Sequence, residues 1–180
     1  MEIKEIADFS RDELVELLRD AAVNWLAHDG LWFRAVEDAF GLEAAMDLDS
    51  KAWEKFTVLE AKRIMTRLNL PQGGGIPALI QALKLRLYAH INLQEISEVS
   101  PDRLVFRMRR CRVQEARERQ GLTPFPCKPI GLVEYGGFAR TIDPRFETRC
   151  LTCPPDPKPE DTWCAWEFTL KKIEDKGPAF

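Results

Sequence analysis

The five cysteines are the residues of this chain with the clearest capacity for chemistry. They are Cys111, Cys127, Cys150, Cys153 and Cys164. Among them, Cys150-Leu-Thr-Cys153 is the one local pair whose spacing lets two thiolates hold a metal ion from both sides of a turn. Soft sulfur ligands suit zinc, and they also suit iron–sulfur clusters. The pattern therefore predicts a cysteine-ligated metal, with zinc as the cofactor and an iron–sulfur cluster as the alternative.

The expected strands bring these cysteines together. Four strands are predicted, over residues 90–96, 103–109, 145–151 and 162–171. Cys111 follows the second strand, Cys150 ends the third and Cys164 opens the fourth. If the third strand pairs antiparallel with the fourth and runs parallel to the second, these positions share one edge of the sheet. Cys127 opens the helix that returns to the third strand, so we expect all five thiols to converge.

Two other interpretations of the cysteines stay open. Cysteine is among the most buried residue types, so the five can be inert core residues. Cys127 can instead be a nucleophile, because it opens a predicted helix beside Lys128 and both features favour the thiolate. The nearest histidines, His28 and His90, lie outside the cysteine-rich segment, and no paired base is visible in the sequence.

The segments that must position these residues are helical in the N-terminal half of the chain. A capping box at Ser10-Arg-Asp-Glu13 predicts the start of a long helix, which Gly41 ends. The predicted helices span residues 11–40, 42–48, 49–68, 77–89, 111–120 and 127–141. The fold class is therefore α+β, with N-terminal helices packed on a small antiparallel or mixed sheet and a helical crossover between strands two and three.

A carboxylate lies within the apolar stripe of the first helix. On a helical wheel, Asp29 falls on the apolar face with Trp32, and His28 lies beside it. Glu60 and Arg63 occupy the matching face of a later helix. Buried carboxylates need a partner, so we expect these five residues to line a small-molecule pocket in which Asp29, Glu60 and Arg63 form a cluster. The alternative is that the glycine after Asp29 breaks the helix and leaves the acids in water.

Arginines are dense in and after the second predicted strand. They are Arg103, Arg107, Arg109, Arg110, Arg112, Arg117 and Arg119. On a strand they alternate with apolar residues and so share one face. That face can bind an anionic ligand or RNA, but the net charge of −3 favours a solvated surface on which the arginines pair with Asp102, Glu115 and Glu118.

Composition fits a folded protein without a membrane segment. The chain has 180 residues, of which 45% are hydrophobic and 31% charged. This predicts one domain over residues 1–174 and a flexible tail over 175–180. The acidic, polar N-terminus differs from a signal peptide, and no stretch is apolar enough to span a membrane. We therefore expect a cytoplasmic protein, with neither a membrane nor nucleic acid as its partner.

Six motifs resemble an uncharacterised family of small cytosolic proteins from anaerobic bacteria and archaea. They are NWLAHDGLWF from Asn24, CRVQEAR from Cys111, FPCKPIG from Phe125, TIDPR from Thr141, RCLTCPPD from Arg149 and WCAWEF from Trp163. This resemblance implies no known activity. The order of helices, hairpin, cysteine-led helix and final strand is distantly similar to the L-2-amino-thiazoline-4-carboxylate hydrolase-like family and to the 4-vinyl reductase-type small-molecule-binding domain.

These observations predict a metal-binding protein with a small-molecule pocket. The first alternative is a thiol- or metal-dependent hydrolase of a small carboxylate, as the distant resemblance implies. The second alternative is an interaction module without catalytic activity. Composition and spacing do not identify the ligand.

Overall fold

The computed structural model describes residues 4–171, and its first long element confirms the predicted capping box. A short 3₁₀ helix, Ile6–Asp8, precedes α1, which spans Arg11–Phe40. The Ser10 hydroxyl accepts a hydrogen bond from the backbone N–H of Glu13 at 3.3 Å, and the Glu13 carboxylate accepts one from Ser10 N at 2.8 Å. Helix α1 continues through the glycine that follows Asp29, so the alternative of a break there is wrong. The tail predicted at 175–180 lies outside the described residues.

Helix α2 spans Leu42–Leu68 as one element, so the prediction of two helices meeting at Asp49 is wrong. Asp49 is not a helix cap, because the residue at the N-cap of α2 is Gly41 and Asp49 lies inside the helix. The Asp49 side chain instead lines a cavity described below. The helix ends where Asn69 takes a left-handed conformation with φ of 53°.

The predicted helix over 77–89 is two elements. Helix α3 covers Gly75–Leu83, and the 3₁₀ helix η2 covers Leu87–His90. Arg86, between them, has extended backbone and a side chain that is only 2% exposed. Its buried ion pairs, described below, require the chain to leave the helical path, which the apolar spacing of this segment does not reveal.

The four strands form one antiparallel sheet in the order β1-β2-β4-β3. Their bounds are Leu93–Ser97 for β1, Arg103–Arg110 for β2, Phe146–Thr152 for β3 and Cys164–Leu170 for β4. Because β4 lies between β2 and β3 and is antiparallel to both, β2 and β3 run in the same direction. Helices α4, Arg112–Arg119, and α5, Lys128–Ile142, make the predicted crossover between β2 and β3.

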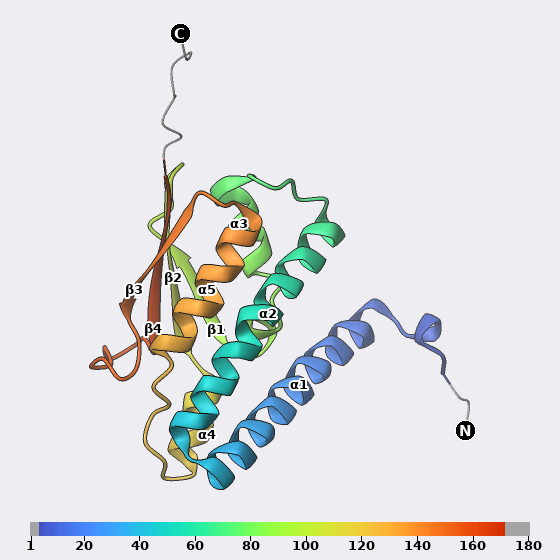
Figure 1. Cartoon of the computed structure of the whole chain (residues 1–180). Helices are drawn as coiled ribbons and strands as arrows, with labels where there is room; N and C mark the ends of the chain where they lie inside the picture. The colour runs from blue at the N-terminus through green and yellow to red at the C-terminus, as the bar shows by residue number, and fades with distance from the viewer. Residues whose placement is uncertain (1–3, 172–180) are drawn as a thin grey trace.

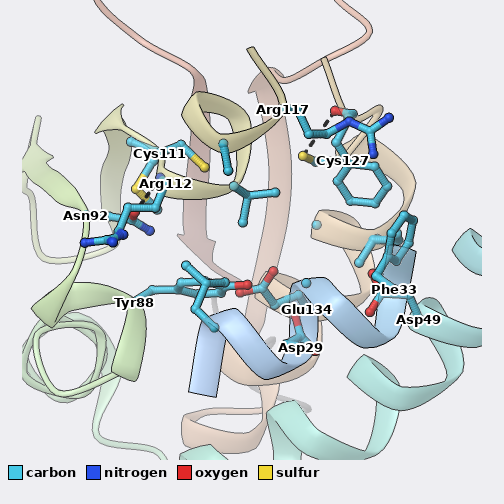
Figure 2. Close-up of a pocket in the computed structure, with 18 of the residues that line it drawn as sticks. Asp29, Phe33, Asp49, Tyr88, Asn92, Cys111, Arg112, Arg117, Cys127 and Glu134 are labelled. Atoms are coloured by element: carbon cyan, nitrogen blue, oxygen red, sulfur yellow. Dashed lines mark hydrogen bonds between the residues drawn. The ribbon is translucent and has the colours of Figure 1, made fainter. Parts of the chain in front are cut away.

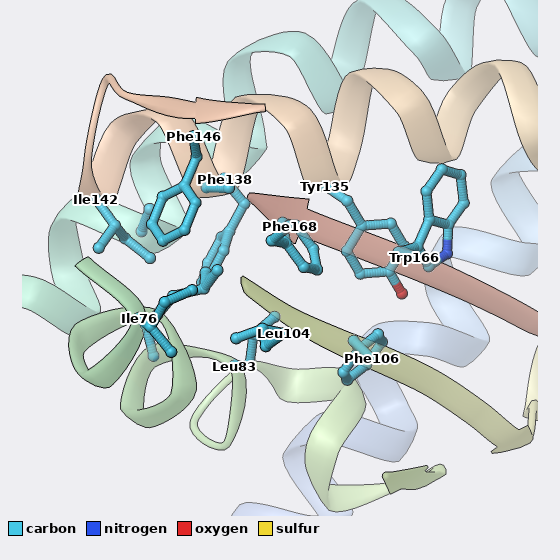
Figure 3. Packing of buried hydrophobic residues seen from close by; sticks show 14 of the residues in the cluster. Ile76, Leu83, Leu104, Phe106, Tyr135, Phe138, Ile142, Phe146, Trp166 and Phe168 are labelled. Atoms are coloured by element: carbon cyan, nitrogen blue, oxygen red, sulfur yellow. The ribbon is translucent and has the colours of Figure 1, made fainter. Parts of the chain in front are cut away.

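The helices lie in layers on one side of the sheet (Figure 1). Helix α5 packs on the sheet, α2 packs on α5, and α1 runs along α2 as the outer helix. Tyr135 and Phe138 of α5 meet Phe106 of β2 and Phe168 of β4 in the core (Figure 3). Helices α2 and α5 lie close together at Gly137, where a Cβ would come within 2.7 Å of a Thr57 methyl group.

The arginines of β2 are paired with acids. Arg103 Nε donates to Glu167 at 2.6 Å, Arg107 Nη2 to Glu98 at 2.6 Å and Arg109 Nε to Glu95 at 2.6 Å. Among the predicted partners, Glu115 binds Arg110 at 3.0 Å, whereas Asp102 accepts from Ser100 instead. These contacts favour the solvated, paired surface over an anion-binding face. Within residues 4–171, no helix is both long and apolar enough to cross a membrane.

Candidate ligand-binding site

A cavity of about 470 Å³ lies between the helices and one end of the sheet. Its walls come from α1, α2, α4 and α5, and Met108 of β2 and Trp166 of β4 lie on the sheet side. Most of the lining is apolar, with Phe33, Val113 and Ile130 among its side chains. A volume of this size is typical of sites for small organic molecules.

Three carboxylates from three different helices line one side of this cavity. Asp29 comes from α1, Asp49 from α2 and Glu134 from α5. Figure 2 shows Tyr88 pointing toward Glu134, with Asp29 and Asp49 on the same side of the cavity. Glu134 is buried, and the two aspartates are partly buried. Acids in such surroundings are costly to ionise unless protons or cations compensate their charge.

Burial raises the pKa of all three carboxyl groups. The pKa of Asp49 rises to about 7, because burial and the nearby acids Asp29 and Glu134 disfavour its ionised form, while the Trp53 side chain opposes the rise. Burial also raises the pKa of Asp29, against an opposing effect of the neighbouring histidine. The pKa of Glu134 is raised by burial, and Arg86 is the main group opposing that rise.

Arg86 is the buried cation behind these acids. Its Nε donates to Glu60 Oε2 at 2.8 Å, and its Nη1 lies 2.7 Å from Glu134 Oε1. The guanidinium also lies 4.7–5.8 Å from the ring centres of Trp53, Tyr88, Tyr135 and Phe138. Burial alone lowers the pKa of Arg86, but Glu134 and Glu60 overcome this and raise it. One guanidinium therefore serves two buried carboxylates, and negative charge remains in excess.

Four cysteines line the opposite side of the cavity. They are Cys111, Cys127, Cys153 and Cys164. Cys127 and Cys164 are the neighbours that act most strongly on the Cys153 thiol, and Cys153 is among the neighbours of the Cys150 thiol. All five cysteines are free. They meet because β2 and β3 end, and β4 and α5 begin, at the same end of the sheet.

The surroundings of Cys111, Cys150 and Cys153 favour the protonated form of these three thiols. Burial raises the pKa of Cys150 to about 11 and that of Cys111 well above its ordinary value. Contacts with the Cys127 and Cys164 thiols, and burial, raise the pKa of Cys153 strongly. As the side chains stand, no group of three or more His, Cys, Asp and Glu residues within 4–171 is arranged to hold a metal ion. The metal site therefore stays a prediction.

A buried glutamine fixes the loop that leads to Cys127. Gln114 Nε2 donates to the Phe125 carbonyl at 2.8 Å and lies 2.9 Å from Cys127 Sγ, while Gln114 Oε1 accepts from Phe125 N at 2.9 Å. Cys127 is the residue that caps the N-terminus of α5. Neither His28 nor His90 is among the residues that line the cavity, so no paired base supports Cys127 as a nucleophile there.

Two buried nitrogen atoms at the cavity have no hydrogen-bond partner among residues 4–171. They are Trp166 Nε1 and Asn92 Nδ2. Trp166 is fully buried, and Asn92 is fixed because its Oδ1 accepts from Arg112 N at 2.9 Å. Buried donors are nearly always paired in folded proteins. Both atoms are fully buried, so an acceptor atom of a ligand or of water reaches them only if neighbouring side chains move.

The structure places one residue of the predicted α1 group in the cavity wall. Asp29 lines it, whereas His28 is exposed and Trp32 has 67% of its surface exposed. The buried face of α1 includes Ala22 and Phe33, which lie to one side of the face assumed on the wheel. Trp32 consequently falls at the rim of the buried face.

The predicted cluster of Asp29, Glu60 and Arg63 does not form. Glu60 is buried, but its cationic partner is Arg86, and Arg63 lies exposed on α2. The sequence pattern correctly placed Glu60 on a buried helix face, but it predicted Arg63, from the same helix, as the cation near it. The actual cation comes from the turn after α3, which only the tertiary fold brings close.

Sequence reasoning missed four residues of the site. They are Asp49, Arg86, Tyr88 and Glu134. Glu134 carried the same signal as Asp29, a single acid within an apolar helix, and could have been found in that way. Asp49 resembled a helix cap, and Arg86 and Tyr88 lie in a segment whose spacing suggested an ordinary amphipathic helix.

One family model matches nearly all of the described residues, including those that line the cavity. A family model described as a family of unknown function (DUF6125) matches residues 7–170, and the chain belongs to that family. The matched residues include the carboxylates and the thiols of the cavity. No curated protein and no solved structure matches the chain.

Proposed function

We propose that this member of the DUF6125 family binds a small organic molecule in the cavity between its helices and its sheet. The observation that carries the proposal is the cavity of about 470 Å³, whose mostly apolar lining includes three carboxylates from three different helices.

The construction of the cavity supports the same proposal. Ligand sites are mostly apolar, with a few polar groups that fix the orientation of the molecule. Here the apolar wall lies between carboxylates on one side and thiols on the other. The buried Gln114 and the ion pair between Arg117 and Glu37, at 3.1 Å, fix α4 and the following loop around the opening. The site is therefore formed before a ligand binds.

A cavity-filling variant tests the proposal. Ala116 lines the cavity from α4, so Ala116→Trp should fill it, while Ala39→Trp adds the same side chain at an exposed position of α1 outside it. Ligand-observed NMR with small aromatic amines, alcohols and carboxylates should detect binders of the native protein and of Ala39→Trp. The same compounds should not bind Ala116→Trp. Absence of any binder, or equal binding to Ala116→Trp, refutes the proposal.

A second candidate function is the binding of a soft metal ion by the thiols. The observation that favours it is the meeting of all five cysteines from four segments of the chain. Zinc is the proposed ion and an iron–sulfur cluster the alternative, and rotation of the cysteine side chains is needed to surround either. Free energy of metal binding would then add to the free energy of folding.

Metal analysis of anaerobically purified protein tests this second candidate. Stoichiometric zinc should be found, or iron with a coloured preparation. Cys150→Ser and Cys153→Ser should lower the metal content and the melting temperature together. If neither metal is present at a stoichiometric level and five thiols titrate as free, the thiols are core residues and the metal site is refuted.

A further inference from the structure

The helical side of the cavity holds more buried acid than base. Asp29, Asp49 and Glu134 line it, and Glu60 lies behind them. Among residues 4–171, Arg86 is the cation that pairs with Glu60 and Glu134, and no ion pair involves Asp29 or Asp49. Glu134, a residue only 7% exposed, has its Oε1 2.7 Å from Arg86 Nη1, but this oxygen accepts no hydrogen bond from a described residue.

The other cations of the lining are Arg34, Arg112, Arg117 and Arg119, and among residues 4–171 none of them forms an ion pair with Asp29 or Asp49. Arg34 binds Glu37 at 2.8 Å, and Arg117 binds the same carboxylate at 3.1 Å. Figure 2 shows Arg117 near Cys127 and Arg112 near Asn92 and Cys111, away from Asp29 and Asp49. The negative charge of the two aspartates is therefore not compensated by the protein's own arginines.

Aromatic rings surround the carboxylates. Phe33, Trp53 and Tyr88 line the same cavity, and the Trp53 and Tyr88 rings stack with centres 5.8 Å apart. Rings and carboxylates both attract an organic cation, which loses little solvation among them. Hard cations such as Ca²⁺ instead require six to eight oxygen ligands, and three carboxylates among apolar side chains do not supply them.

We infer that the cavity binds an organic cation, a protonated amine or a quaternary ammonium, whose charged end lies among Asp29, Asp49 and Glu134. The uncharged body of this molecule extends along the apolar wall toward Trp166 and the thiols. This inference rests on the proposed function and specifies its ligand class. A carboxylate ligand would place like charges together, and a neutral ligand would leave the acids uncompensated.

Four matched probes test the inference by isothermal titration at pH 7.5. They are 2-phenylethylamine, benzyltrimethylammonium, 2-phenylethanol and 3-phenylpropionate. The two cations should bind at least about tenfold more tightly than the alcohol, since a charge-assisted contact is worth about 1.5–3 kcal/mol, and the carboxylate should bind most weakly. Cation–ring contacts without a hydrogen bond allow the quaternary ammonium to bind as well.

Variants then assign the selectivity to the carboxylates. Asp29→Asn and Asp49→Asn keep the shape of each side chain and should each weaken binding of the cations about tenfold, a larger loss than either variant causes for the uncharged 2-phenylethanol. Asp20→Asn on α1 and Asp47→Asn on α2 are matched controls, because both residues are exposed and outside the cavity lining. Melting curves of each variant verify that it is folded.

The outcomes separate the ligand class from the proposed function. If 2-phenylethanol or 3-phenylpropionate binds as tightly as the cations, the inference is wrong while small-molecule binding stands. Equal binding of the cations by the native protein and by both cavity variants also refutes the inference. If none of the four probes binds, the cavity does not act as a site for such molecules, and the inference and the proposed function fail together.

Discussion

Arg86 and Glu134 join two distant segments of the chain beneath the cavity, with 2.7 Å between Arg86 Nη1 and Glu134 Oε1. Arg86 follows α3 and Glu134 lies in the middle of α5, so the pair connects the turn after α3 to the helix that covers the sheet. Both side chains are buried, and Glu60 of α2 completes the group with a bond of 2.8 Å. A buried ion pair need not stabilise a fold, but removal of one partner leaves the other charge unpaired.

Arg86→Met should destabilise the protein by about 3–5 kcal/mol, because Glu60 and Glu134 would remain buried without a cation. The free energy of unfolding from urea titration measures this effect. Arg110→Met is the matched control, since Arg110 has 70% of its side chain exposed and pairs with Glu115 at the surface. Loss of that surface pair should cost about 0–1 kcal/mol.

A double variant separates charge from packing in the same group. Adding Glu134→Gln to Arg86→Met removes one of the two unpaired carboxylates, so part of the lost stability should return. If the double variant is as unstable as the sum of both single variants, the cost arises from the packing of Arg86 against its aromatic neighbours.

The raised pKa of Asp49 predicts that the stability of the protein depends on pH. Its pKa is about 7 in the folded protein against an ordinary value of 3.8, so the folded state holds more protons than the unfolded chain between these values. The stability that Asp49 contributes therefore falls as pH rises from about 4 to about 7, at a rate approaching 1.4 kcal/mol per pH unit. The charged groups that act on Asp49 are Asp29 from α1 and Glu134 from α5.

Urea unfolding of the native protein and of Asp49→Asn at pH 5 and pH 8 measures this dependence. The variant should gain stability relative to the native protein at pH 8 and gain less at pH 5, because an amide does not ionise. Asp47→Asn, exposed on the same helix, should show no such difference between the two pH values. An equal gain at both pH values would show that the charge of Asp49 is not responsible.

The fold was predictable wherever local signals and tertiary packing agree. The capping box of Ser10 and Glu13, the presence of four strands and the crossover between β2 and β3 all follow from short-range patterns. The predicted start of the first strand at His90 is wrong, because His90 lies in η2 and β1 begins at Leu93. The predicted break at Asp49 fails because this acid, which resembles a helix cap in the sequence, lies inside the continuous helix α2 and lines the cavity. The predicted single helix over 77–89 is wrong around Arg86, because the backbone there leaves the helical path and Arg86 forms ion pairs with Glu60 and Glu134 of two other helices.

The thiol side of the cavity is easier to predict from the sequence than the carboxylate side. Strand order alone places Cys111, Cys150 and Cys164 at one end of the sheet, so the meeting of the thiols was predictable. The grouping of the three acids was not predictable, because they come from α1, α2 and α5 and meet only through the packing of these helices. Periodicity identifies that Asp29 is partly buried, but only the packing of α1 and α5 around α2 shows that it lines the same cavity as Glu134 and not as Arg63.

Two glycine substitutions should have opposite effects on stability. A Cβ at Gly131 would come within 2.5 Å of Trp166 Cζ2, so either the fully buried ring of Trp166 or helix α5 must shift to admit it. Gly131→Ala should therefore destabilise the protein by about 1–3 kcal/mol and change the near-ultraviolet circular dichroism of the tryptophans.

At Gly30, in the middle of α1, a Cβ would meet no atom within 4 Å, so Gly30→Ala should stabilise the helix by about 0.5–1 kcal/mol. Urea unfolding gives both values. The two variants add the same methyl group to helical backbone, so effects of equal sign would show that the contact between α5 and Trp166, which forms the sheet side of the cavity, is looser than the structure describes.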